Sequence, residues 1–374
     1  MYPMHVLNNT LSLITPQSED WRARARERLD QLTMPHWALG RLMDLAVDLA
    51  GMTRSLKPPV GRKVVVVMAA DHGVVAEGVS HYPQEVTWQM VANFIGRGAG
   101  INALADQAGA DVRVVDMGVA QSTESLVRSG AVLPFSVGPG TANMARGPAM
   151  GREQAITCVE NGIRVAQRMI EEGYDLIGVG EMGIGNTTAS AALVAALCGE
   201  SPAATTGRGT GIDDATWRHK VAVIERALAI NGLAPGVDAP LSGREYGLEA
   251  LARVGGFEIG GIAGVILGAA ARKRPVVIDG FISTTGALVA QSLMPSAVDY
   301  LIAAHRSVEQ GHRIALNRLG KEPLLDLQLR LGEGTGAALA MNLVEASARV
   351  LSEVRTFAEA AVSQSNAPQS AAPG

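Results

Sequence analysis

The amino-acid sequence predicts an α/β protein with a doubly wound, mostly parallel sheet and a smaller helical domain built from both chain ends. Short apolar runs such as KVVVVMAA do not alternate with polar residues, which is typical of strands buried on both faces of a sheet. Segments with helical periodicity separate these runs, as in sheets that carry helices on both faces. Helical periodicity also marks both ends of the chain.

The composition excludes several classes of function. Of 374 residues, 47% are hydrophobic and 18% are charged, so the chain can bury a large core. The net charge of −4 gives no electrostatic basis for binding nucleic acid. The N-terminus lacks the pattern of a signal peptide, and no apolar run is long enough to span a bilayer, which argues against a membrane role. Cys158 and Cys198 are expected as buried thiols in a cytoplasmic protein.

The predicted elements follow in chain order. Residues 1–55 are expected to contribute N-terminal helices to the small domain, with Ser18 as the cap of a helix. Residues 60–304 are expected to form the sheet domain, and residues 305–362 a helical segment that completes the small domain. The polar tail, 363–374, is predicted to be disordered. The expected strands are 63–73, 111–119, one beginning at 175, 274–283 and 297–307.

Polar residues follow four of these strands. They are Asp71-His72-Gly73, Asp116-Met117-Gly118, Glu181-Met182-Gly183 and Asp279-Gly280. In open α/β sheets the ligand crevice lies outside the carboxyl ends of the strands. The four strand ends therefore predict one shared site.

The segment GEMGIGNTTAS predicts a strand, a glycine turn and a helix in succession. The free N–H groups and the dipole of that helix would attract an anion, and Asn186 and Thr187 could cap it. A glycine turn needed only for packing is an equally good explanation. Lys220, further along, could reach the same anion, although a solvated lysine on a helix surface is the simpler interpretation.

The segment RLGEGTGAALA places Glu333 between Gly332 and Gly334, with apolar residues on both sides. A partly desolvated carboxylate there would have a raised pKa, as a general base needs. A solvated surface turn is the alternative. The Asp71-His72 pair is a weak indication of metal, since no further ligands are suitably spaced.

Several nucleotide and hydrolase motifs are absent from the sequence. It contains no phosphate-binding P-loop, no G-x-S-x-G elbow and no G-x-G-x-x-G after the first strand. A nicotinamide-dependent oxidoreductase on the same sheet is therefore a disfavoured alternative.

Five segments together, AADHGV, GEMGIGNTTAS, GFEIGGIAGVILGAA, DGFIS and RLGEGTGAALA, resemble the nicotinate-nucleotide–dimethylbenzimidazole phosphoribosyltransferase family. The resemblance covers roughly residues 30–360 and implies a Rossmann-like fold, a homodimer and no metal or other cofactor. It implies that nicotinate mononucleotide gives its phosphoribosyl group to 5,6-dimethylbenzimidazole with inversion. The products would be α-ribazole 5′-phosphate, the precursor of the cobalamin lower nucleotide, and nicotinate.

The resemblance also implies roles for individual residues. Glu333 matches the general base, and Glu181 is expected to act with it or to support it. The expected substrate-binding residues are Gly183, Ile184, Gly185, Asn186, Thr187, Lys220, Asp279, Ser283, Tyr82, Gln89, Met90, Leu331 and Gly334. A non-catalytic relative that binds the benzimidazole or its riboside is a second alternative, but the intact Glu333, Glu181 and Lys220 argue against it.

Overall fold

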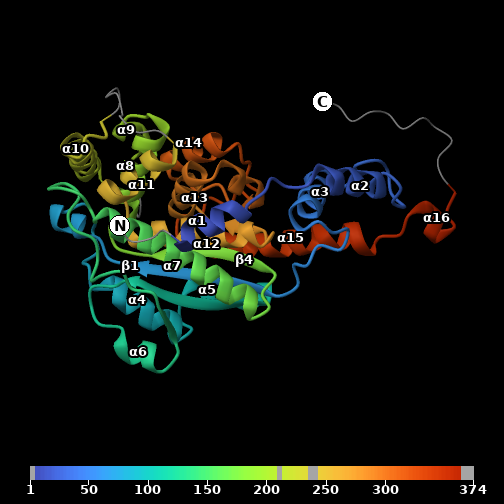
Figure 1. The fold of residues 1–374 in the computed structure, drawn as a ribbon, viewed down its shortest axis with the longest axis horizontal. Helices are drawn as coiled ribbons and strands as arrows, with labels where there is room; N and C mark the ends of the chain where they lie inside the picture. The colour runs from blue at the N-terminus through green and yellow to red at the C-terminus, as the bar shows by residue number, and fades with distance from the viewer. Residues whose placement is uncertain (1–4, 209–212, 235–242, 364–374) are drawn as a thin grey trace.

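A computed structural model describes residues 5–208, 213–234 and 243–363 of the chain, so most of the predicted tail lies outside the described residues. Its centre is a sheet of six parallel strands in the order β3-β2-β1-β4-β5-β6 (Figure 1). This is the strand order of the Rossmann fold, with the direction of strand progression reversing between β1 and β4. The strands are β1 Lys63–Ala70, β2 Ala110–Gly118, β3 Val132–Pro134, β4 Leu176–Met182, β5 Val276–Ile278 and β6 Leu301–Ala303.

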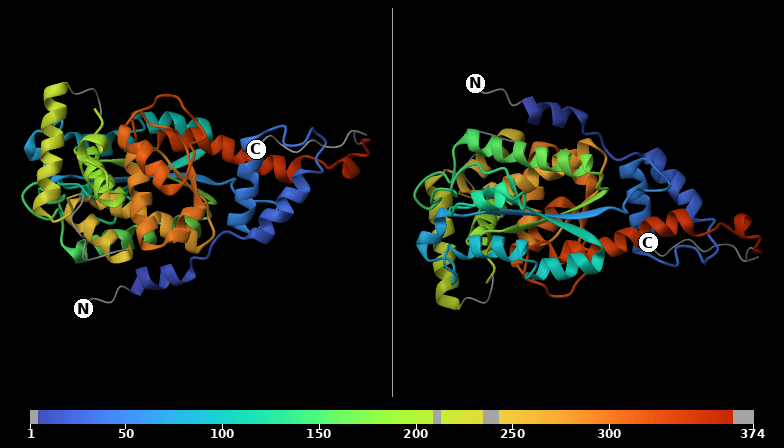
Figure 2. Two further views of the ribbon diagram at one scale, coloured as in Figure 1. Left: turned by 90° about the horizontal axis from the view of Figure 1, so that it is seen from above. Right: turned by 90° about the horizontal axis from the view of Figure 1, so that it is seen from below.

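The two faces of the sheet are covered by different helices. α4 (Val86–Ile95), α5 (Gly100–Ala108) and α15 (Thr335–Glu353) pack on one face, and α5 and α15 lie side by side (Figure 2). α12 (Phe257–Ala271), buried along nearly its whole length, packs on the other face beneath α7 (Arg152–Glu171). Its glycines allow the backbones of α12 and α7 to touch, since a Cβ at Gly162 would lie 1.9 Å from the carbonyl oxygen of Gly261.

Other helices lie beyond the ends of the strands or outside the first helical layers. These elements are α6 Glu124–Arg128, α8 Asn186–Cys198, α9 Pro202–Thr205, α10 Asp214–Ile230, α11 Gly243–Val254, α13 Phe281–Leu293, α14 Gln310–Leu319 and the 3₁₀ turns η1 Gly73–Glu77 and η2 Pro295–Tyr300. No helix within the described ranges combines the length and the hydropathy needed to cross a bilayer.

A second, smaller hydrophobic cluster joins segments from both parts of the chain. It contains residues of α2 (Glu19–Leu29) and α3 (Arg41–Thr53) together with Leu351 from the end of α15. In Figure 1 these helices and α16 (Phe357–Ala360) extend from the sheet domain. Ser18 caps α2 as predicted, its hydroxyl accepting from the Trp21 N–H.

The extent of this lobe differs from the predicted division of the chain. α1 (His5–Leu13) packs on α7 and α12, and its Leu7 and Leu11 belong to the main core. α14 and most of α15 also pack in the main core. Strand β3 was not predicted, because three residues at a sheet edge give too little pattern.

Candidate functional site

A cleft of about 410 Å³ lies beyond the carboxyl ends of β4 and β5, next to the point where strand progression reverses. This is the position at which open α/β sheets bind ligands. Thirteen of the fifteen predicted residues line it: Glu333, Glu181, Gly183, Ile184, Gly185, Asn186, Thr187, Lys220, Asp279, Ser283, Tyr82, Met90 and Leu331. Gln89 and Gly334 are not among the lining residues.

Helix geometry explains the position of Gln89. Val86 and Met90 on α4 are four residues apart, so they share one helix face and both line the cleft. Gln89 is exposed and projects from another part of the helix surface. Gly334 is the N-cap of α15, and its N–H donates to Asp279 Oδ2 at 3.2 Å.

The Glu333 turn is held by close backbone packing. Gly332, Glu333 and Gly334 have φ of 80°, 63° and 91°, so a non-glycine residue occupies the left-handed region between two glycines. A Cβ at Gly180 of β4 would lie 2.3 Å from the Glu333 carbonyl oxygen, and one at Gly332 would lie 2.4 Å from Glu181 Oε1. The glycines therefore let the turn lie directly against β4 and bring the two acids together.

Both acids have raised pKa values. Burial, with the neighbouring carboxylates of Asp279 and Glu258, raises the pKa of Glu181 to about 8, against a hydrogen bond from the Asn186 side chain. Burial also raises the pKa of Glu333, while the Ile101 N–H, 3.2 Å from Glu333 Oε2, opposes the shift. Both carboxyl groups thus hold a proton more readily than an ordinary glutamate does, which is common among groups that exchange protons in active sites.

Asp279 serves the fold at the edge of this cleft. Its carboxylate accepts hydrogen bonds from the N–H groups of Gly336 at 2.5 Å and Ala337 at 3.0 Å as well as from Gly334. Burial raises the pKa of Asp279 to about 7, against these three bonds, which favour the charged form. A carboxylate at a helix N-terminus interacts favourably with the helix dipole, so Asp279, which follows β5, fixes the start of α15 and the turn that carries Glu333.

A cationic and polar region faces the acids across the cleft. Lys220 on α10 is buried, and its Nζ donates to Thr187 Oγ1 at 2.8 Å. The solvated interpretation of this lysine is therefore wrong. Burial lowers the pKa of Lys220 to about 8, and nearby Glu309 opposes the shift. Thr187 stands in the first turn of α8, whose N-cap, Gly185, has a φ of 94°.

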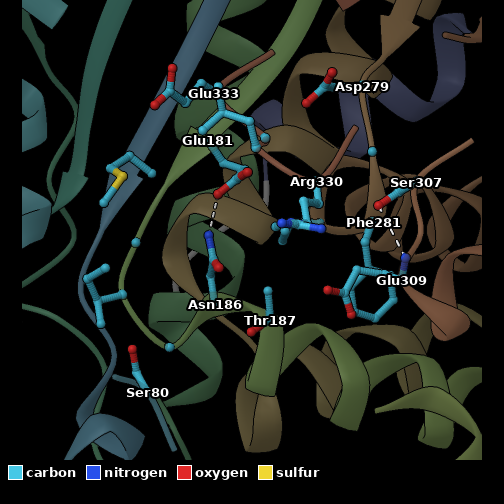
Figure 3. Close-up of a pocket in the computed structure, with 18 of the residues that line it drawn as sticks. Ser80, Glu181, Asn186, Thr187, Asp279, Phe281, Ser307, Glu309, Arg330 and Glu333 are labelled. Atoms are coloured by element: carbon cyan, nitrogen blue, oxygen red, sulfur yellow. Dashed lines mark hydrogen bonds between the residues drawn. The ribbon is translucent and has the colours of Figure 1, made fainter. Parts of the chain in front are cut away.

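Figure 3 shows how the labelled side chains are arranged. Glu181 and Glu333 lie near each other, Thr187 lies across the cleft, and Arg330 projects between them. Arg330 was not predicted from the sequence, although it precedes Glu333 by three residues in the same loop. Ser307 and Glu309 were not predicted either; they follow β6 and could have been found by extending the strand-end rule to the fifth predicted strand.

His72 does not face an open metal site. Its Nε2 lies 2.8 Å from Glu258 Oε1 on α12, and both side chains are fully buried. Within the described ranges, no group of three or more His, Cys, Asp and Glu side chains is arranged to hold a metal ion. The two cysteines are free thiols: Cys158 is buried and Cys198 is partly exposed.

Comparison with known proteins adds three findings. A family described as phosphoribosyltransferase matches residues 14–362. The nicotinate-nucleotide–dimethylbenzimidazole phosphoribosyltransferase of Syntrophotalea carbinolica is 61% identical over 361 residues, covering 96% of this chain and 99% of the relative. The protein of the same name from Desulfotalea psychrophila is 54% identical over 360 residues, covering 96% of this chain and 99% of the relative.

Solved structures agree with these relatives. The crystal structure of CobT from Thermus thermophilus has a TM-score of 0.86 and 49% sequence identity, covering 92% of this chain and 100% of that chain. A crystal structure of the phosphoribosyltransferase from the same organism has a TM-score of 0.85 and 48% identity, covering 93% of this chain and 100% of that chain.

Proposed function

The chain belongs to the nicotinate-nucleotide–dimethylbenzimidazole phosphoribosyltransferase family, and we infer that it transfers the phosphoribosyl group of nicotinate mononucleotide to 5,6-dimethylbenzimidazole. The products are α-ribazole 5′-phosphate and nicotinate, in the assembly of the cobalamin lower nucleotide. The observation that supports the assignment of roles is that the same cleft is lined by two acids, Glu181 and Glu333, and by a buried lysine, Lys220, which donates to Thr187 at the start of α8.

Glu333 acts as the general base in this proposal. Its carboxylate takes the N–H proton of the benzimidazole, and the other ring nitrogen then attacks the anomeric carbon of the ribose. The new nitrogen–carbon bond forms as the bond to the pyridinium nitrogen breaks, and that electron pair neutralises the leaving nicotinate ring. The raised pKa of Glu333 suits this task, because a base is most effective when its pKa approaches the working pH.

Glu181 supports the reaction from the adjoining position. Its carboxyl, beside the Glu333 turn, can donate a hydrogen bond while protonated and can oppose positive charge at the ribose once ionised. The carboxyl groups of Glu181, Asp279 and Glu333 favour a donor whose reacting ring is a cationic pyridinium, because ionised carboxylates stabilise positive charge on the ring and the ribose before the bond breaks.

The phosphate of the nucleotide occupies the opposite region. Lys220 supplies the positive charge, and the glycine turn that leads into α8 supplies backbone N–H groups at a helix N-terminus. Met90, Val86 and Tyr82 supply an apolar wall for the flat acceptor ring. Asp279 and Ser283 complete the nucleotide side, with Asp279 acting through the α15 turn that it caps.

The assay for the proposed reaction follows both products at once. Purified protein is mixed with nicotinate mononucleotide and 5,6-dimethylbenzimidazole, and free nicotinate and the riboside phosphate are separated by HPLC. We expect equimolar formation of both, dependent on the added base. Tight binding of the base without nicotinate release would instead support a non-catalytic binding protein.

We also propose that the protein is a cytoplasmic homodimer. Dimerisation is an expectation from the family resemblance, and the free thiol of buried Cys158 suits a reducing compartment. Light scattering coupled to size-exclusion chromatography tests the assembly, and a mass equal to one chain of 38.9 kDa would contradict it. Cell fractionation tests the location.

A further inference from the structure

Asn102 lies outside the cleft, yet its side chain joins two elements that build it. The residue is buried, in the first turn of α5. Its Oδ1 accepts from the Ala99 N–H at 3.1 Å, and its Nδ2 donates to the Phe94 carbonyl oxygen at 3.1 Å. One side chain thus ties the last turn of α4 to the first turn of α5.

Each of the two helices contributes directly to the site. α4 presents Val86 and Met90 to the cleft. The first turn of α5 presents the Ile101 N–H, which donates to Glu333 Oε2 at 3.2 Å in a buried position. Within the described ranges no other hydrogen bond holds the Glu333 carboxylate.

The contact between α5 and the Glu333 loop depends on close approach. A Cβ added at Gly100 would lie 2.8 Å from Leu331 Cδ2 and 3.5 Å from Glu333 Oε2. Glycine at this position therefore lets the helix N-terminus reach the acid. A displacement of the α5 turn would lengthen the Ile101 hydrogen bond to Glu333.

We propose that Asn102 is a positioning residue for the transfer reaction. It holds the Ile101 N–H against the Glu333 carboxylate, and it fixes the position of that carboxylate relative to Val86 and Met90 on α4, which line the proposed site of the benzimidazole. The proposal rests on the proposed role of Glu333 as the general base. Asn102 touches neither substrate, and it acts through the two helices that it joins.

A pH profile distinguishes this role from a general contribution to folding. The Ile101 hydrogen bond favours the ionised form of Glu333 and so opposes the rise in pKa caused by burial. Glu181 and Asp279 also lie close to Glu333, and both would raise its pKa further if ionised, whereas the positive charge of Arg330 in the same cleft would lower it. Losing the bond should therefore raise the pKa of Glu333 and move the acidic limb of the activity profile to higher pH.

The experiment compares Asn102→Ala with wild type and with Gln107→Ala. Gln107 is on the same helix and accepts from Asn342 of α15 at 3.3 Å, away from the first turn, so its variant removes an α5–α15 contact without touching the base. For Asn102→Ala we expect the acidic limb of kcat to rise by about one pH unit and the plateau kcat to fall about tenfold. The KM for nicotinate mononucleotide and the profile of Gln107→Ala should stay unchanged.

A second variant covers the case in which Asn102→Ala does not fold. Asn102→Ser is too short to reach the Phe94 carbonyl oxygen, so it removes the bond between α4 and α5 with a smaller change of volume and should shift the acidic limb in the same direction. A profile identical to wild type in whichever of these variants folds overturns the proposal, as does an equal shift in Gln107→Ala. If Glu333→Gln is inactive while the Asn102→Ala profile is unshifted, only the positioning role fails. If Glu333→Gln is fully active, Glu333 is not the general base, and the proposed mechanism fails together with the positioning role.

Discussion

Two glycine turns at helix N-termini have similar backbone conformations, but different side chains lie beside their N–H groups. Gly185 caps α8 with a φ of 94°, and Gly334 caps α15 with a φ of 91°. At α15 the carboxylate of Asp279 accepts from three backbone N–H groups of the turn and first helical residues. At α8, among the described residues, no carboxylate accepts a hydrogen bond from the first-turn N–H groups. Lys220 instead donates to the side chain of Thr187 in that turn.

A helix N-terminus therefore binds whichever anion the rest of the fold allows. The anion site of α15 is filled internally, which fixes the Glu333 turn in place. The N-terminus of α8 has a lysine beside it instead of an acid, and we propose that a substrate phosphate binds there. The same local motif thus anchors a base in one place and is proposed to bind the nucleotide in the other.

The largest expected effect is the loss of the base held by the α15 turn. We expect Glu333→Gln to fold and to lose about 10²–10⁴-fold in turnover, because the amide cannot accept the benzimidazole proton. Nicotinate release measured by HPLC checks the rate, and circular dichroism checks the fold. Turnover equal to wild type would remove Glu333 from the mechanism.

The next effect comes from forcing the α15 turn away from β4. In Gly180→Ala the new Cβ would meet the Glu333 carbonyl oxygen at 2.3 Å, so the turn must move. We expect roughly a hundredfold loss of kcat and a fall of about 1–3 kcal/mol in unfolding free energy.

Gly178→Ala is the matched control for this variant. Its Cβ would meet the flexible terminal methyl of Met341 at 2.8 Å and the side chains of Ala337 and Val65 at 3.3 Å, but no backbone atom of the Glu333 turn. The two variants are compared by steady-state kinetics and chemical denaturation. Equal losses of activity would show that the Glu333 turn is not specially sensitive to its contact with β4.

A smaller effect is expected at the α8 turn. Lys220→Met should raise the KM for nicotinate mononucleotide roughly 10–100-fold and change kcat less, since a hydrogen bond to a charged group contributes about 1.5–3 kcal/mol. Arg218→Met on the exposed surface of the same helix is the control. An unchanged KM in Lys220→Met would place the phosphate elsewhere.

The pH dependence of activity reports on both turns at once. Activity should fall at low pH as Glu333 is protonated, at a pH above the usual range of a glutamate because its pKa is raised. It should fall again as pH rises through about 8, where Lys220 in the free protein loses its proton, because burial lowers its pKa to about 8. The measurement is kcat/KM for the nucleotide against pH.

Variants assign the high-pH limb. The pKa of Glu181 is also about 8, so the limb should persist in Glu181→Gln and move upward in Lys220→Arg if the lysine causes it. Loss of the limb in Glu181→Gln would assign it to the acid instead.

The strand ends show which parts of the site the sequence pattern could predict. Continuous apolar runs predicted the parallel strands, and the polar residues after β4 and β5 do meet at one cleft. The prediction of one site shared by four strand ends was only half right, because Asp71-His72-Gly73 and Asp116-Met117-Gly118 do not line that cleft. The short strand β3 was not predicted, and neither were the cleft-lining residues after β6. The burial of Lys220 was harder to predict, because the sequence of α10 gives no sign that this lysine packs near Thr187 and Glu309.

The parallel α/β architecture, the family and the two acids could all be read from the sequence, because periodicity and motif order are local properties of the chain. Only the folded structure shows which charged groups lie close enough to shift one another's pKa. Glu181 and Glu333 are far apart in sequence, and they adjoin because glycines allow the α15 turn to lie against β4. Their raised pKa values follow from that burial, which depends on packing between distant segments.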